Sequence, residues 1–286
     1  MNTTSIWRGR TSAKTPTTTT SPSPTILATE TTPSPTVTQL PATVASPPTP
    51  AGPATPRVYE SSVTILTYGY ELGFQETGPE DPVYPYPRMD LAQVGPPTPR
   101  TYQALVLEND YVALTILPEM GGRIYRWVDK ATGRQLLYQN PVVKPSEWGY
   151  RGWWLAVGGI EWAFPVDEHG LNEWRPWRYS TGYTNAGLAV TVWDVEERTG
   201  MEVGATIALD AEHSYVTLQP WARNDTDAAH PYQLWLNGML TLGGNSVSGQ
   251  TQFVIPAQQV VVHSTGDLSL PAPGGRWIGR CTAGGT

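Results

Sequence analysis

Residues 101–117 read TYQALVLENDYVALTIL, and this stretch decides the fold class. Two short runs rich in Val, Leu, Thr and Tyr, Thr101–Glu108 and Tyr111–Leu117, flank the turn pair Asn109-Asp110. Apolar and β-branched residues on either side of a short polar turn are typical of neighbouring antiparallel strands. The stretch therefore predicts a β-hairpin.

The same pattern recurs on both sides of Gly-rich and Asn-rich turns along most of the remaining chain. A period near two dominates, and no stretch shows an amphipathic helical period over about twelve residues or more. We therefore expect an all-β protein built from two large stacked antiparallel sheets. The further strand-like segments are GGRIYRWVD (121–129), RQLLY (134–138), GLAVTVWDVEE (187–197), MEVGATIALD (201–210), SYVTLQPWARN (214–224) and YQLWLNGMLTL (232–242).

The N-terminal segment differs sharply from this body. More than half of residues 11–57 are Thr or Pro, none is aromatic, and only three are charged. Such a composition offers too little apolar surface to offset the entropy of ordering, and its prolines favour an extended coil. We expect residues 1–57 to be a disordered Thr/Pro-rich linker or stalk, followed by one globular domain at residues 58–286.

Charge and composition narrow the classes of function. The net charge is −7 and the basic residues are scattered, so the chain has no basic footprint for nucleic acid. One cysteine and four widely spaced histidines form no metal-ligand motif, and no metal or cofactor is expected. No apolar run approaches the length of a transmembrane segment. Thr/Pro-rich stalks commonly carry extracytoplasmic or cell-surface domains. We expect that location, with the export signal upstream of Met1.

Residues 148–170, WGYRGWWLAVGGIEWAFPVDEHG, hold four of the twelve tryptophans and several polar side chains. Glu161 follows Gly158-Gly159 and lies between Ile160 and Trp162, where a carboxylate is desolvated and suited to acid–base work. Glycines there allow a backbone or a ligand to approach closely. The alternative is a glutamate that points to solvent or binds a backbone amide. Adjacent Trp153 and Trp154 must face opposite sides of a strand.

Residues 165–179 do not alternate and predict a long loop, a common place for functional residues on a β scaffold. His169 follows Asp167-Glu168, and neighbouring carboxylates favour its protonated form, so His169 is a candidate proton donor. An ordinary polar loop has the same composition. Residues 224–227, Asn-Asp-Thr-Asp, lack the spacing of a calcium loop and predict a turn.

Further candidates line the expected ligand site. Aromatic faces match the C–H faces of sugar rings, which singles out Trp162, Trp174 and Trp177, although core packing also explains them. Arg123 and Arg151 adjoin glycines and could hold hydroxyl pairs, while Asn237 offers an amide; solvated strand residues remain the alternative. The partner predicted by this set is a sugar or oligosaccharide.

Several ordered motifs resemble an uncharacterised bacterial domain family in the galactose mutarotase-like (aldose 1-epimerase) superfamily, some of whose members carry tetratricopeptide repeats. The resemblance covers about residues 58–270 and implies a β-supersandwich. The motifs are LENDYVALTILPEMGGRIYRWVDKATGRQLLYQNP (107–141), RGWWLAVGGIEWAFP (151–165), VYPYPRMD (83–90), YQLWLNGML (232–240) and VVVHSTGD (260–267).

The resemblance implies a sugar site but departs from epimerase chemistry. Aldose epimerases use a histidine acid and a glutamate base, and FPVDEHGLNEWRPW carries the acid role onto His169. The strand expected to hold a second histidine reads YQLWLNG, and the glutamate near the domain's C-terminus has no counterpart. Residues after 272 are Gly-rich and atypical, which predicts a C-terminus that is truncated or frameshifted.

Three hypotheses follow from these residues. The first is a mutarotase-like carbohydrate-binding domain that acts on a sugar by acid–base chemistry through Glu161 and His169. The second is a noncatalytic carbohydrate-binding module on a stalk, and the third is a protein-interaction scaffold.

Overall fold

A computed structural model describes residues 55–165, 171–248, 250–252, 254, 259–262, 271–272 and 274–277. Among these residues the helices are three short 3-10 turns, η1 (Tyr70–Gly73), η2 (Leu91–Gln93) and η3 (Pro118–Met120). In this described part of the chain, no helix has the length and apolar character needed to cross a membrane. The prediction of an all-β fold is confirmed.

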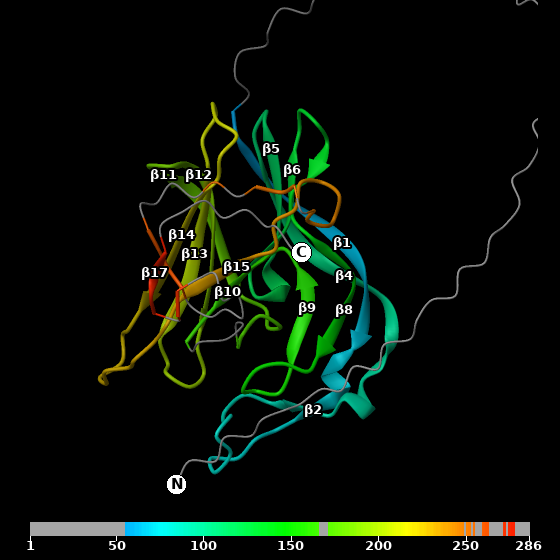
Figure 1. Cartoon of the computed structure of the whole chain (residues 1–286), viewed down its shortest axis with the longest axis vertical. Helices are drawn as coiled ribbons and strands as arrows, with labels where there is room; N and C mark the ends of the chain where they lie inside the picture. Colours follow the sequence, from blue (N-terminus) through cyan, green and yellow to red (C-terminus); the bar gives the residue numbers. More distant parts are fainter. Residues whose placement is uncertain are drawn as a thin grey trace, which may run out of the picture. The chain divides into compact units, whose positions relative to one another are not determined.

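The larger sheet has nine strands and curls strongly (Figure 1). Its order is β15-β10-β6-β5-β4-β1-β8-β9, with β7 paired to β6. All its pairings are antiparallel except that of β1 with β8, which is parallel. Parallel strands need a long crossover connection, and here β4 to β7 lie between the two strands in the sequence. The strands are β1 (Arg57–Gly69), β4 (Gly95–Glu108), β5 (Val112–Leu117), β6 (Arg123–Asp129), β7 (Arg134–Gln135), β8 (Gln139–Ser146), β9 (Trp154–Gly158), β10 (Ile160–Ala163) and β15 (Trp235–Gly238).

The second sheet is an antiparallel meander of four strands in the order β11-β12-β13-β14. Two short pairs, β2 with β3 and β16 with β17, complete the described strands. The predicted strand segments between residues 187 and 224 correspond to β12, β13 and β14. The bounds are β11 (Arg178–Thr184), β12 (Gly187–Val195), β13 (Glu202–Leu209), β14 (Thr217–Arg223), β2 (Phe74–Gln75), β3 (Arg88–Met89), β16 (Val260–Val261) and β17 (Arg276–Trp277).

Strand β4 shows how the sequence shapes the large sheet. Its first half contains Pro96, Pro97 and Pro99, while its pairing with β5 covers only Leu105–Glu108. Proline has no backbone N–H to donate to a ladder. It is therefore accepted where a strand has a single neighbour. The proline-rich half therefore pairs with β1 alone, and the apolar half enters the centre of the sheet.

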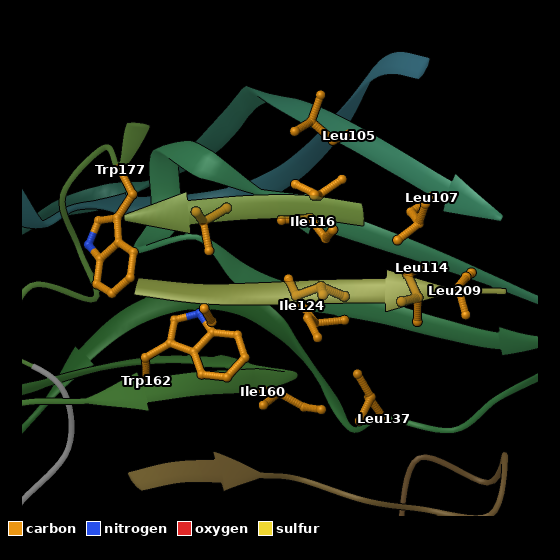
Figure 2. Packing of buried hydrophobic residues seen from close by; sticks show 14 of the residues in the cluster. Leu105, Leu107, Leu114, Ile116, Ile124, Leu137, Ile160, Trp162, Trp177 and Leu209 are labelled. Atoms are coloured by element: carbon orange, nitrogen blue, oxygen red, sulfur yellow. The ribbon is translucent and has the colours of Figure 1, made fainter. Parts of the chain in front are cut away.

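The main core lies between the two sheets (Figure 2). Leu105, Leu107, Leu114, Ile116 and Ile124 extend from the large sheet toward the four-stranded one. Alternate residues of β12 and β13 meet them from the other side. At about 25 cal/mol per Å² of buried apolar surface, this two-layer contact is the main source of stability. The residues supplied by β12 and β13 are Leu188, Val190, Val192, Val203, Ala205, Ile207 and Leu209.

A second core lies on the opposite face of the large sheet. Leu105 and Leu107 of β4 belong to the first core, whereas Tyr102 and Ala104 of the same strand belong to the second. The same division occurs in β6, where Ile124 faces the four-stranded sheet and its neighbour does not. Both faces of the large sheet are therefore partly covered, which explains the imperfect alternation of its strands.

Two consecutive glycines join β9 to β10 and let the ends of the curled sheet approach each other. Gly158 has φ +96° and Gly159 has φ +83°, a region that side chains disfavour. A Cβ at Gly158 would lie 2.4 Å from the Tyr138 carbonyl oxygen, and one at Gly159 would lie 2.3 Å from that of Ile124. The glycines thus admit neighbouring backbone, one of the two options that the sequence left open.

Candidate functional site

The candidate site is built around Glu161, at the second position of β10. Ile160 and Trp162 belong to the core between the sheets, so Glu161 extends from the other face of the strand. Only 1% of its surface is exposed. The desolvated environment expected for this carboxylate is therefore present.

Three strands supply donors to this carboxylate. Arg123 Nη2 of β6 lies 3.2 Å from Glu161 Oε2, and Trp154 Nε1 of β9 lies 3.4 Å from the same oxygen. Asn237 Nδ2 of β15 donates to Oε1 at 3.3 Å. An arginine at this distance favours the ionised carboxylate. The arrangement fixes a negative charge between three separate segments of the chain.

Strand register places more of the site on the same face. Asn237 is the direct partner of Glu161 across the β10–β15 pair, and Trp235 is the partner of Ala163. Directly opposed residues share a face, so Trp235 and Asn237 lie beside Glu161. Trp154, Trp235 and Asn237 are half-buried, which makes them the solvent-accessible part of the group. We call Arg123, Trp154, Glu161, Trp235 and Asn237 the Glu161 cluster.

Arg123 is completely buried, with 0% of its surface exposed, and its guanidinium is occupied by the protein. Besides Glu161, it donates from Nη1 to the Gly158 carbonyl oxygen at 2.8 Å. Its predicted contact with substrate stays a prediction. In the structure, Arg123 holds Glu161 and the glycine bend in place.

Arg151 is the second predicted ligand fork, and it is also buried, with 1% exposed. Its Nη2 lies 2.7 Å from Glu173 Oε1, and its Nη1 donates to the Leu171 carbonyl oxygen at 2.8 Å. The guanidinium also lies 3.9 Å from the centre of the Trp153 ring. Arg151 therefore anchors the loop at residues 171–173, and its predicted contact with substrate stays a prediction.

Glu173 was not predicted as a site residue. Burial raises the pKa of its carboxyl above the ordinary value, the Arg151 guanidinium opposes this shift, and the negative charge of Glu161 adds to it. Its Oε2 has no hydrogen-bond partner among the described residues. The negative charge of one buried glutamate thus contributes to the raised pKa of the other. Only its place in the predicted functional loop pointed to it.

The tryptophans divide between core and site. Trp162 and Trp177 are 3% and 5% exposed and pack in the core between the sheets, which is the core-packing alternative to their predicted role as sugar-stacking surfaces. Trp174 packs against the second core, with its ring 4.7 Å from that of Phe74. Its half-buried ring is largely occupied by protein.

The adjacent pair Trp153 and Trp154 faces opposite ways, as strand alternation predicted. Trp153 is 1% exposed and belongs to the second core, whereas half-buried Trp154 donates to Glu161. Trp154 and Trp235 are therefore the aromatic side chains of the site. Neither residue was among the predicted site residues. Strand alternation predicts that neighbouring side chains lie on opposite faces, but it does not predict which face the core covers.

The remaining sequence candidates lie elsewhere. His169, Asp167 and Glu168 lie outside the described residues. Residues 224–227 form the predicted turn, in which the Thr226 amide donates to Asn224 Oδ1 at 3.0 Å. Among the residues that the structure describes, no three His, Cys, Asp or Glu side chains come together as a metal site would require.

Comparison with known proteins gives a family and a structural neighbour. A family model described as a domain of unknown function (DUF5107) matches residues 79–273. A crystal structure of a TPR-domain containing protein from Parabacteroides distasonis ATCC 8503 is 27% identical in sequence, with a TM-score of 0.56. The match covers 64% of this chain and 32% of that one, so the chain spans about a third of the protein it resembles.

Proposed function

The chain belongs to the DUF5107 family of domains of unknown function, and from the geometry of the Glu161 cluster we propose that it binds carbohydrate. The observation that carries the proposal is the Glu161 carboxylate, held by side chains from three strands beside half-buried Trp154, Trp235 and Asn237. A fixed acceptor, an amide and indole rings are the groups that recognise a polyol with apolar ring faces.

The charge of the cluster supports a neutral ligand. Arg123 compensates Glu161 at 3.2 Å, so the pair carries little net charge and attracts neither phosphate nor a cation strongly. A hydroxyl donates well to an ionised carboxylate, and an amide both donates and accepts. Sugar hydroxyls satisfy both kinds of group. The proposal places this domain among mutarotase-like carbohydrate-binding domains.

A glycan array probed with purified protein, followed by calorimetry on the hits, tests the proposal. Glu161→Gln removes the charge but keeps the shape, and a hydrogen bond to a charged group is worth about 1.5–3 kcal/mol. We therefore expect about a 10- to 100-fold loss of affinity. Glu202→Gln is the matched control, because Glu202 of β13 pairs with Arg223 in the other sheet. Wild-type protein that binds no glycan, or a Glu161→Gln variant that binds as well as wild type, would overturn the proposal.

Acid–base turnover of the bound sugar is a second candidate, favoured by the raised pKa of the buried Glu173 carboxyl and by the second buried carboxyl of Glu161. A carboxyl whose pKa is raised can act as a general acid, and a second carboxyl can act as the base. NMR of a freshly dissolved pure anomer of each bound sugar measures this directly. Faster anomerisation with wild type than with Glu173→Gln supports turnover, and equal rates leave binding as the function.

A further inference from the structure

A cavity of about 540 Å³ lies between the segment that ends β3 and begins η2 and the turn that joins β8 to β9. Its volume falls within the range of small-molecule sites, about 300–1,000 Å³. Its walls combine two carboxylates, a tryptophan and two glycines with few other large side chains. The lining residues are Met89, Asp90, Leu91, Ala92, Glu147, Trp148, Gly149 and Gly152.

Trp148 is the distinctive side chain of this cavity, because 57% of its surface is exposed. Leaving so large an apolar ring in water costs stability, and such exposure commonly marks a binding surface. Glu147 and Asp90 line the same cavity and bring two acidic residues to it. Asp90 Oδ1 already accepts from the Ala92 amide at 3.0 Å, which fixes the direction of its carboxylate.

Buried contacts of Arg151 hold the turn that carries Trp148. Arg151 extends inward from it and bonds Glu173 and the Leu171 carbonyl oxygen, while Trp148 and Tyr150 are exposed. The Gly152 amide closes the turn by donating to the Gly149 carbonyl oxygen at 3.2 Å. An aromatic surface on an anchored turn loses little conformational entropy when a ligand binds.

The cavity is also connected to the Glu161 cluster through one strand pair. Ser146 at the end of β8 is paired with Trp154 at the start of β9, and Trp154 donates to Glu161 at 3.4 Å. Glu147, which follows Ser146, lines the cavity. The lining of the cavity therefore begins at the residue that directly follows this strand pair in the sequence.

We propose that this cavity is a second sugar subsite, with Trp148 as its stacking surface, so that the domain binds an oligosaccharide of at least two rings. One ring lies against the Glu161 cluster and the next lies on Trp148, where its hydroxyls donate to Asp90 and Glu147. This inference rests on the proposed function and specifies the size of its ligand.

Calorimetry with sugars of two lengths tests the second subsite. The probes are glucose, mannose, galactose and xylose, each compared with its β-1,4-linked trisaccharide. We expect wild type to bind its preferred trisaccharide more tightly than the monosaccharide. Trp148→Ala lowers trisaccharide affinity about tenfold and leaves monosaccharide affinity unchanged, and Trp148→Phe keeps most of the difference because a ring remains. Tyr183→Ala, which removes a ring 72% exposed on β11, is the control.

The outcomes separate this inference from the proposed function. Monosaccharide binding that depends on Glu161, with no gain for the trisaccharide, overturns the second subsite and leaves the proposed function standing. An equal loss for both lengths in Trp148→Ala also overturns it, because the ring then belongs to the first subsite. Absence of binding to every sugar overturns both proposals.

Discussion

Two buried arginine–glutamate pairs lie in the described part of the chain, and they differ in the contacts that their carboxylates make. Arg123 and Glu161 are 0% and 1% exposed, and the side chains of Arg151 and Glu173 are 1% exposed each. The contacts of Glu161 include donors at 3.2–3.4 Å from three different strands. Glu173 receives one short contact of 2.7 Å from Arg151, and its second oxygen has no partner among the described residues.

The difference shows that burial alone does not assign a role to a charged pair. The Arg123–Glu161 pair joins half-buried side chains, so its charge can reach a ligand through hydroxyls that approach Asn237 and Trp154. The Arg151–Glu173 pair ties a loop to a turn and holds a carboxyl whose pKa is raised. Under the proposed function, the first pair contributes to recognition of the ligand, whereas the second holds the loop at residues 171–173 in position.

Of the substitutions that test this comparison, the replacement of Arg151 is expected to have the largest effect on the free energy of unfolding. Arg151→Met leaves Glu173 buried without its cation, which costs about 3–5 kcal/mol of unfolding free energy near neutral pH. Urea denaturation followed by tryptophan fluorescence measures this loss. The loss shrinks at acid pH, where Glu173 takes up a proton and no longer needs a counter-charge.

The double variant Arg151→Met/Glu173→Met is the matched control, because replacing both members of a buried ion pair by apolar residues is often neutral. A loss below about 1 kcal/mol in the single variant, as for exposed ion pairs, would show that the pair is not buried in solution.

Titration of Glu173 gives a smaller effect. Its pKa is raised on folding, so between the unfolded and the folded pKa the folded chain binds more protons than the unfolded one. Wild-type stability therefore falls as pH rises through that window, by up to about 1.4 kcal/mol for each unit by which the pKa is raised. Glu173→Gln lacks this dependence, so its melting temperature gains on that of wild type as pH increases.

Thermal melts of wild type, Glu173→Gln and the control Glu202→Gln across a pH series check the titration of Glu173. Parallel pH profiles for wild type and Glu173→Gln would show that Glu173 ionises normally and would remove the contrast between the two glutamates.

The smallest effect on stability comes from Asn237→Ala. It removes one hydrogen bond of 3.3 Å to Glu161 but leaves the ion pair with Arg123 intact. We expect a loss of about 1 kcal/mol in unfolding free energy and about a fivefold loss of sugar affinity. Calorimetry on the best glycan, with thermal melts alongside, measures both. Unchanged affinity would confine the recognition surface to the tryptophans.

Much of the fold was predictable because the alternation of apolar and polar residues in a strand is visible within a single segment of the sequence. The alternation in residues 101–117 and 187–210 gave strands that the structure contains, and the turn at residues 224–227 was read from its side chains. The break between β9 and β10 was visible only as Gly158-Gly159. Its meaning depends on the Tyr138 and Ile124 carbonyl oxygens, which come from other strands.

The site was predictable only in part, because its geometry is set by pairings between distant segments. Glu161 could be selected by its apolar neighbours, and Asn237 by its amide. Neither segment alone predicts that the two residues pair directly across β10 and β15. Trp162, next to Glu161 in the strand, lies on the other face and packs in the core. The pairing of Arg123 and Arg151 with buried glutamates could not be predicted, because arginine beside glycine looks the same in sequence whether its partner is a ligand or a buried glutamate.

The pairing of β10 with β15 has a consequence for how the candidate site is formed when the domain folds. All four strands of the smaller sheet lie between β10 and β15 in sequence, so Asn237 reaches Glu161 across 76 positions. Contacts so far apart in the chain form slowly, since a large loop must close first. The Glu161 cluster is therefore complete only once β15 has paired with β10, after the chain of the whole smaller sheet has been placed between them. Binding of the proposed ligand would thus depend on a pairing that neither segment can make alone.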